Sequence, residues 1–516
     1  MSEMNLCRRN LLKAGAAAAA GIMASAAANA GIPAAKVEKY DEEYDVVIIG
    51  SGFAGMACAL KAGRAGKKVL MLEKMPVVGG NSAICGGNVA CPVNPVQKAQ
   101  GIKDSRELFI ADCLKDGLGL NHVELLSKIV DRCNDTIKFV EDCGAEFVPN
   151  HMLFEGGHSV PRSYEIKAGT GSGYIHPMYD QIKKLSNVTV KTRAKFDDFI
   201  MDGDAVVGVT YREGYRFNAK LQSDDLENKT GKTKTVRAKL GVMLAAGGFS
   251  RDIWFRQIQD PRVVPTTDST NQLGATAGVL VKSLGIGAAP VQLCWLQFLP
   301  YTNPREKGFG VSVNFTNHAC MDFGIVVDRK TGKRFMDENN TYVVKARTTA
   351  LQTLDNQAWV IVDSECPVLD KVIAKFDRLH SPYGKADTIE ELCKQVNLPE
   401  KNVVKEVKAY NDALAAGKLE EMVPPCTYKK PHPVAKAPFY AVPFQGGMTA
   451  TFGGPLINTK AEIQSLDGGS IPGLYAAGNA AGGIFFFNYA GGAQLGAATV
   501  YGRIAGRELA NRAKQN

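Results

Sequence analysis

Hydrophobic and polar positions follow a strand, helix, strand order near the start of the chain. The apolar run Val46 to Ile49 predicts a buried parallel strand, and the run Lys68 to Leu72 predicts a second one. The Ala-rich segment between them has helical character and ends near Gly66. This order is typical of a βαβ unit, so it predicts an α/β fold with a parallel sheet.

The turn that joins the first strand to the helix is Gly50-Ser51-Gly52-Phe53-Ala54-Gly55, a G-x-G-x-x-G pattern. In this setting Gly50 permits a tight turn, Gly52 lets backbone N–H groups approach a pyrophosphate, and Gly55 lets helix and strand pack closely. The pattern predicts dinucleotide binding by Gly50, Gly52, Ala54 and Gly55, with Glu73 and Lys74 near the ribose. A Gly-rich turn in an ordinary α/β unit is the alternative.

Further Gly-rich segments occur later in the chain, and backbone donors in such loops can surround phosphates and a ring system. They add these candidate cofactor-binding residues: Gly80, Asn81, Ser82, Gly86, Gly87, Gly247, Gly248, Gly478, Asn479, Gln494 and Leu495. In contrast, the polar stretch Leu221 to Lys234 lies between two predicted strands and predicts a surface hairpin insertion.

A change in composition predicts the domain organisation. Residues from about 288 to 440 carry more aromatic and charged side chains in short mixed elements, which indicates an inserted α+β domain. We therefore predict a Rossmann-like nucleotide-binding domain in two parts, 31–287 and 441–516, interrupted by the domain 288–440.

The first thirty residues have the features of an export signal. Arg8-Arg9 begins a twin-arginine pattern, an Ala-rich run follows, and Ala28-Asn29-Ala30 is a candidate cleavage site. The Ala-rich run is too weakly apolar to span a membrane. The pattern predicts a mature protein in the bacterial periplasm, with no membrane span.

Charge and cysteine spacing exclude several classes of site. The formal net charge of +9 is spread along the chain without basic runs, which argues against nucleic-acid binding. No C-x-x-C-H motif is present, so no c-type haem is expected, and seven scattered histidines do not predict a metal site.

At this point the chain resembles the flavoprotein family of soluble fumarate reductases of the flavocytochrome c type, with L-aspartate oxidases, urocanate reductases and 3-ketosteroid dehydrogenases as relatives. The matching segments are GSGFAG, GGNS, AAGGF, GATAG, GKRFMDE, INTKAEI, IPGLYAAGN and YGRIAG. The resemblance implies a non-covalent FAD and a capping domain over a small-molecule substrate. It also implies hydride transfer between flavin N5 and an activated carbon.

The family's residues for binding a dicarboxylate are not kept. Aligned by motif, a substrate-binding His falls on Leu299, the proton-donating Arg on Tyr342, a second His on Thr449 and a clamping Arg on Tyr489. In the T-E-x-x-R segment only Thr316 is kept. The resemblance therefore indicates Tyr342, Tyr489, Thr316 and Thr449 as candidate catalytic residues. A buried dicarboxylate needs cations to offset its desolvation, so fumarate is not the expected substrate.

We expect a reductase of an activated C=C bond in an unsaturated monocarboxylate (acrylate, methacrylate or cinnamate) or in an enone. Tyr342 would donate the proton, and a separate c-type cytochrome would supply electrons. A 3-ketosteroid-dehydrogenase-like oxidation and a non-catalytic electron-transfer flavoprotein are the alternatives. Candidate cations for a monocarboxylate are Arg162, Lys167, Lys345 and Arg347. Candidate apolar pocket residues are Trp295, Phe298, Tyr301 and Phe485 to Phe487, with core packing as an equal alternative for the last three.

Overall fold

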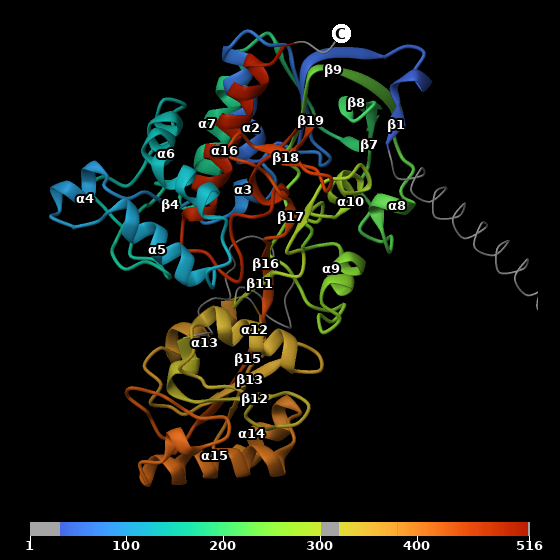
Figure 1. Ribbon diagram of the computed structural model, residues 1–516. Coiled ribbons are helices and arrows are strands. Elements are labelled where there is room, and N and C mark those ends of the chain that lie inside the picture. The colour runs from blue at the N-terminus through green and yellow to red at the C-terminus, as the bar shows by residue number, and fades with distance from the viewer. Residues whose placement is uncertain (1–30, 301–318, 379, 514–516) are drawn as a thin grey trace, which may run out of the picture.

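The computed structural model describes residues 31–300, 319–378 and 380–513. The predicted export signal, Thr316 and Tyr301 lie outside these residues. The described chain forms two bodies, an upper one that holds both ends of the described chain and a lower one formed by its later middle part (Figure 1). In the described part, no helix combines the length and apolarity needed to cross a bilayer.

The upper body is built on one mixed sheet. Its main path is β1-β7-β8-β9-β2-β3-β6, and β19 joins β9 and also pairs with β18. The strands are β1 (Ile32–Pro33), β2 (Glu42–Ile49), β3 (Val69–Leu72), β6 (Val188–Lys191), β7 (Ala194–Asp202), β8 (Ala205–Glu213), β9 (Lys232–Leu244), β18 (Glu462–Gln464) and β19 (Ser470–Ala476). Strands β6, β3, β2, β9 and β19 run parallel to their neighbours in this group, which confirms the predicted parallel α/β unit.

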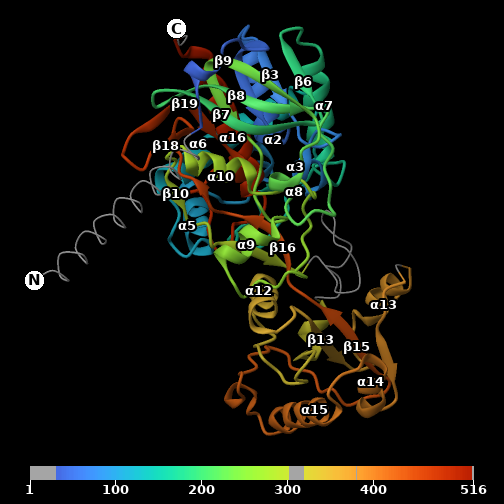
Figure 2. The ribbon, with the colours of Figure 1, turned by 90° about the vertical axis from the view of Figure 1, so that its right-hand side faces the viewer.

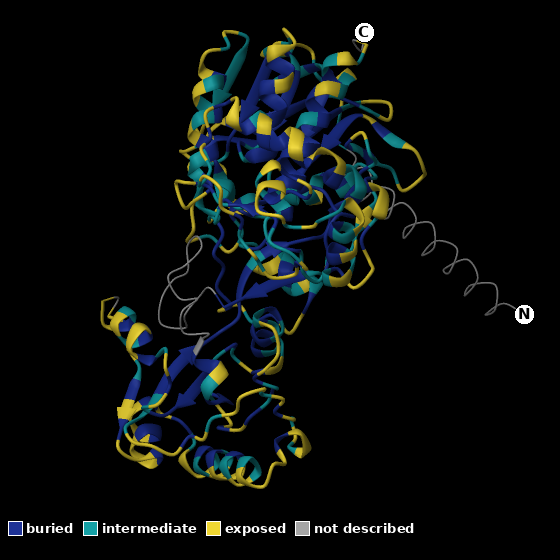
Figure 3. Ribbon diagram, turned by 90° about the vertical axis from the view of Figure 1, so that its left-hand side faces the viewer, coloured by how far each residue is buried: buried dark blue, intermediate teal, exposed yellow. Residues whose placement is uncertain are grey.

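Two helices cross closely beside this sheet because glycines lie at their contact. They are α2 (Phe53–Arg64) and α16 (Ala493–Asn511). A Cβ added at Gly502 would lie 2.4 Å from the Ala54 carbonyl oxygen, and one at Gly506 would lie 2.7 Å from the Cys58 carbonyl oxygen. The first and last α-helices of the described chain therefore pack backbone to backbone, and most of their residues are buried. The middle of the upper body is largely dark blue, the colour of buried residues (Figure 3).

The remaining elements of the upper body are shorter or surround this core. They are η1 (Ala34–Lys36), α3 (Gly80–Ile84), β4 (Val89–Ala90), α4 (Pro95–Ala99), α5 (Arg106–Asp116), α6 (Val123–Glu141), β5 (Ser163–Tyr164), α7 (Ser172–Lys183), α8 (Asp224–Glu227), α9 (Ile253–Gln259), α10 (Gly278–Gly285), β10 (Pro290–Val291), β17 (Gly454–Pro455) and η4 (Gly478–Ala480). Of these, α3, α5, α8 and η4 matter for the site described below.

The lower body has its own antiparallel sheet in the order β12-β13-β15-β14. Its elements are η2 (Ala319–Phe323), β12 (Ile325–Asp328), α12 (Tyr342–Gln352), β13 (Ala358–Val362), α13 (Leu369–Arg378), β14 (Gly384–Ala386), α14 (Ile389–Val396), α15 (Glu400–Ala415), η3 (Leu419–Glu421) and β15 (Phe439–Phe444). The antiparallel pair β11 (Leu296–Leu299) and β16 (Gly447–Thr451) lies between the two bodies (Figures 1 and 2).

Candidate active site

One cavity of about 1510 Å³ lies at the carboxyl ends of the parallel strands. The residues at or just after the ends of β2, β3, β9 and β19 line it: Ile49, Leu72, Ala245 and Ala477. Ligands bind at this edge in open α/β sheets. From there the cavity extends to Gln297, Tyr342 and Thr449, on the side of the lower body.

The Gly-rich turn after β2 brings backbone against this cavity. Gly50 has φ +105°, and a Cβ there would lie 2.3 Å from the Ala245 carbonyl oxygen. A Cβ on Gly55 would lie 2.1 Å from the Gly50 carbonyl oxygen. Both positions therefore require glycine, which keeps the N-terminus of α2, capped by Gly52, close to the cavity. This geometry fits a pyrophosphate.

Glu73 and Lys74 follow β3 and line the cavity. The Glu73 carboxylate is buried and accepts hydrogen bonds from the hydroxyl and N–H of Ser51 and from the Met75 N–H, at 2.8 Å for the last. Burial raises the pKa of Glu73. Lys74 Nζ donates to Thr276 Oγ1 at 2.6 Å. Glu73 thus joins the Gly-rich turn to the end of β3.

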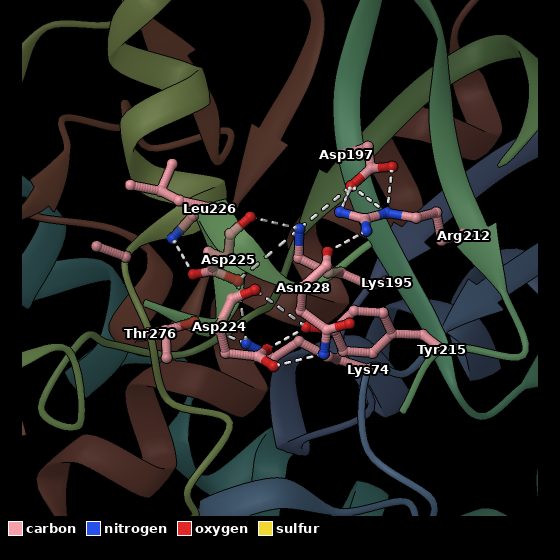
Figure 4. A network of polar contacts seen from close by, with 12 residues as sticks. Lys74, Lys195, Asp197, Arg212, Tyr215, Asp224, Asp225, Leu226, Asn228 and Thr276 are labelled. Carbon is pink, nitrogen blue, oxygen red and sulfur yellow. Dashed lines mark hydrogen bonds and ion pairs between the residues drawn. The ribbon is translucent and has the colours of Figure 1, made fainter. Parts of the chain in front are cut away.

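The sequence predicts a surface hairpin insertion at 221–234; the stretch does join the antiparallel strands β8 and β9 and is largely exposed, but it is not only a surface feature. This stretch contains α8, and its residues Asp225 and Leu226 line the cavity (Figure 4). Asp225 is held by the Gly278 N–H at 2.9 Å and by Lys74 at 3.5 Å. Although burial opposes the shift, the nearby cations lower the pKa of Asp225. The polarity of this stretch indicates its exposure correctly, but it does not reveal that Asp225 pairs inward with two lysines distant in the sequence.

Neighbouring charges extend this network. Arg212 Nη2 and Asp197 lie 2.7 Å apart, and Lys195 Nζ lies 3.1 Å from Asp197 and 3.9 Å from Asp225 (Figure 4). Burial lowers the pKa of Lys195 despite these carboxylates. Arg212, Asp197, Lys195 and Asp225, together with Lys74, line one end of the cavity, called here the charged end. No sequence motif marks the first four.

Most of the other predicted cofactor-binding residues come together in this cavity. The lining includes Gly50, Gly52, Ala54, Gly80, Asn81, Ser82, Gly86, Gly87, Gly247, Gly478, Asn479, Gln494 and Leu495. Ser82 Oγ accepts from the Phe53 N–H at 3.0 Å, and Gln494 donates to Asn479 at 2.7 Å. Gly55 and Gly248 are not in the lining: Gly248 lies against Thr451, where a Cβ would be 2.1 Å from Oγ1.

The end of the cavity nearest the lower body, called here the substrate end, contains both predicted catalytic tyrosines and Thr449. It is lined by Asn88, Glu155, Gly156, Gln297, Leu299, Tyr342, Thr449, Asn488, Tyr489, Gly491 and Gly492. Tyr342 is the first residue of α12, after the N-cap Thr341. Burial, followed by the Asp116 and Glu155 carboxylates, raises the pKa of Tyr342 to about 12.

A chain of side-chain hydrogen bonds runs along this end. Thr449 Oγ1 donates to Gln297 Oε1 at 3.0 Å, and Gln297 Nε2 donates to Asn488 Oδ1 at 2.8 Å. Asn488 Nδ2 then donates to Asp116 Oδ2 at 3.1 Å. Tyr489 packs edge-on against Phe452, with ring centroids 5.9 Å apart. Of these, Gln297, Asn488 and Asp116 were missed, since nothing in the local sequence marks their contacts.

None of the four candidate cations reaches the substrate end, and its described lining contains no Lys, Arg or His. Arg162 is fully buried between Asp104 and Asp112, at 2.8 and 2.6 Å. The other three are also engaged elsewhere: Lys345 pairs with Asp322, Lys167 pairs with Glu146, and Arg347 lies over the Trp295 ring.

The predicted aromatic pocket is also wrong for the described residues. Phe298, Phe485 and Phe486 are buried in the protein core, and none of the predicted aromatics in the described chain lines the cavity. In β11 the side chains alternate, so Gln297 and Leu299 face the cavity while Phe298 faces away from it. Trp295 packs edge-on against Phe487 at 6.1 Å instead.

The fold and this cavity define an FAD-binding protein. The sequence matches the FAD binding domain family over residues 45–495, and the chain belongs to that family. The turn with Gly50, Gly52 and Gly55 beside the α2 N-terminus fits the pyrophosphate of this cofactor. The residues of the charged end, opposite the substrate end, fit its polar groups.

Similar proteins of known name show which FAD-binding proteins this chain resembles. The chain is 36% identical over 522 residues to the acrylate reductase flavoprotein subunit of Shewanella woodyi, covering 98% of this chain and 99% of that one. It is 29% identical to the urocanate reductase of Eggerthella lenta, covering 91% and 75%. Its structure resembles the open conformation of a flavocytochrome c3 fumarate reductase, with a TM-score of 0.74, 26% identity, and coverage of 91% and 78%. The predicted family is therefore confirmed.

Proposed function

We propose that this protein is a periplasmic FAD-dependent reductase of the activated C=C bond of a small unsaturated monocarboxylate, acrylate first, and not of fumarate. The observation that carries the proposal is the substrate end itself. It combines two tyrosines and neutral amides with no cation among its described residues. Similarity along nearly the full length to an acrylate reductase subunit supports the choice of acrylate.

The N-terminus of α16 supports one carboxylate rather than two. Gly492 caps this 19-residue helix and lines the substrate end. A helix N-terminus carries positive partial charge and backbone donors, so it favours a single anionic group. A dicarboxylate would leave its second charge without a compensating cation among the described residues that line this end.

The residues have distinct tasks in this proposal. When bound, FAD supplies the hydride donor, and the protein supplies position and a proton. Tyr342 donates its hydroxyl proton to the carbon next to the activating group. Tyr489 and the start of α16 hold the activating group, and the hydrogen-bonded row Thr449, Gln297 and Asn488 orients the substrate.

We also propose that FAD is held non-covalently and that a separate c-type cytochrome delivers the electrons. The relative from Shewanella woodyi is named a flavoprotein subunit, which supports a partner protein. Arg8-Arg9 and the Ala-rich run after it support export.

The test is reoxidation of the dithionite-reduced protein under argon, followed by flavin absorbance. We expect acrylate or methacrylate to reoxidise the flavin at least about 100-fold faster than fumarate. Rapid reoxidation by fumarate would refute the proposal. Reoxidation by a steroid enone alone would instead favour the ketosteroid-dehydrogenase-like alternative.

A further inference from the structure

The turn at Gly156 and Gly157 contacts both the Tyr342 hydroxyl and the Asp116 carboxylate beside the substrate end. A Cβ on Gly156 would lie 2.9 Å from the hydroxyl oxygen of Tyr342, and a Cβ on Gly157 would lie 2.1 Å from Oδ2 of Asp116. The Tyr342 hydroxyl and the Asp116 carboxylate thus lie against consecutive residues of the same turn.

The proposed function, on which this inference rests, requires Tyr342 to regain a proton in every cycle. The substrate gains a hydride and the Tyr342 proton, the C=C bond becomes a C–C bond, and Tyr342 is left as phenolate. A buried phenolate near two carboxylates is unfavourable, in keeping with the raised pKa of Tyr342. No Lys, Arg or His in the described lining of the substrate end can neutralise it.

We propose that Asp116 returns the proton to Tyr342 after each reduction and takes the next proton from solvent. No hydrogen bond joins Asp116 to Tyr342 in the described chain, so the transfer runs through one water: the Asp116 O–H bond breaks, the water passes a proton on, and the Tyr342 O–H bond forms. The Asp116 carboxylate is then protonated by water at the protein surface. Asp116 does not contact the reacting atoms, so it acts through Tyr342.

The location of Asp116 suits this task. It is the last residue of α5, it is half-buried, and Asn488 Nδ2 fixes its Oδ2 at 3.1 Å. Burial raises the pKa of Asp116, and Asp112 of the same helix adds to this effect, while Lys115 and the Asn488 hydrogen bond oppose it. The negative end of the helix dipole also favours the protonated form. Tyr342 from α12 and Glu155 from the turn face the same region.

Glu155 is the competing proton source. Its Oε1 accepts from Asn88 Nδ2 at 2.9 Å, and its Oε2 is buried without a hydrogen-bond partner among the described residues. Glu155 lines the cavity itself, where a bound substrate would cover it, whereas Asp116 lies outside the lining. We assign Glu155 the role of keeping the proton on Tyr342 through its charge.

The experiment compares a single turnover with continuous turnover in the FAD-loaded protein. In Asp116→Asn, mixing reduced protein with acrylate should reoxidise the flavin within about threefold of the wild-type rate, because Tyr342 still holds one proton. Steady-state turnover with reduced methyl viologen should fall about 100-fold. A pH indicator should show proton uptake from solvent lagging behind flavin reoxidation in this variant only.

The pH profile gives a second reading that needs no variant. Asp116 delivers a proton only when protonated, so wild-type turnover should fall as pH rises through its raised pKa. The single-turnover rate should not follow this fall. Glu107→Gln, an exposed change on the same helix, should behave as wild type.

The outcomes separate the two proposals. If no alkene reoxidises the flavin, or if Tyr342→Phe keeps its single-turnover rate, the proposed function fails, and the relay fails with it. If Tyr342→Phe is slow but Asp116→Asn matches wild type in turnover and pH profile, only the relay is overturned. The relay is also overturned if Glu155→Gln, and not Asp116→Asn, produces the lag in proton uptake.

Discussion

The motif resemblance aligns two tyrosines, Tyr342 and Tyr489, with positions where it implies arginines in soluble fumarate reductases, and such an exchange would change the chemistry of the site. An arginine carries a permanent charge with a fork of donors, whereas a tyrosine offers one neutral hydroxyl. Tyr342 and Tyr489 line the same substrate end although they lie far apart in the sequence. The pair suits proton donation and polarisation rather than the binding of a second carboxylate.

Tyr342→Phe tests the first of these roles. The phenyl ring keeps the packing but cannot donate a proton, so kcat should fall by about 10² to 10⁴. The bound flavin spectrum should not change. Stopped-flow reoxidation measures the effect, and an unchanged kcat would remove Tyr342 from the mechanism.

A substitution of Lys74 tests whether the charged end of the cavity contributes to FAD binding. Lys74→Met removes its bond to Thr276 and its pairing with Asp225, and leaves a buried carboxylate less compensated. We expect FAD affinity to fall about tenfold, measured by fluorescence as FAD is released on dilution. Lys98→Met, a change at an exposed position of α4, should retain wild-type affinity.

At the scale of elements, the crossing of α2 and α16 holds the sheet and the cavity together. The two helices come from opposite ends of the described chain, and glycine allows their backbones to touch. Two glycines of α16 differ sharply in this respect. A Cβ on Gly502 would collide with the Ala54 backbone at 2.4 Å, whereas one on Gly496 would find its nearest neighbour at 3.9 Å.

This contrast predicts opposite effects of one substitution within one helix. Gly502→Ala should lower the free energy of unfolding by about 2 to 3 kcal/mol, because backbone must move. Gly496→Ala should be neutral or stabilising by up to about 1 kcal/mol, because alanine favours the helix. Urea unfolding of both variants measures this. Equal destabilisation would contradict the assigned packing.

Local patterns explain which parts of the fold were predictable. The strands β2 and β3 and the glycine turn between them follow from adjacent residues, and the structure has them where expected. The network around Asp225 depends on partners such as Lys74, 151 residues away, which no local pattern reveals. Likewise, the sequence marks Phe298 as a pocket residue, but the strand alternation of β11 turns Gln297 and Leu299 to the cavity instead.

At the scale of the whole molecule, FAD binding and stability are coupled. The cavity of about 1510 Å³ receives its lining from both halves of the chain, from Ile32 to Ala498. A ligand that binds only the folded state stabilises it by mass action, by about 2.7 kcal/mol at a concentration 100 times its Kd. Removal of FAD should therefore lower Tm by several degrees, as calorimetry can measure, and added FAD should restore it. An unchanged Tm would mean that FAD does not bind preferentially to the folded chain.

The contacts of α8 with the cavity lining have a consequence for how fast the protein exchanges its cofactor. Asp225 of this helix accepts a hydrogen bond from the Gly278 N–H at the start of α10 and pairs with Lys74, so three separate segments of the cavity lining are tied together. We expect bound FAD to exchange slowly with free FAD, because these contacts of Asp225 would have to break before the cofactor could leave past α8. Each protein molecule would then keep one FAD through many turnovers, and it would take up this FAD when it folds rather than between reactions.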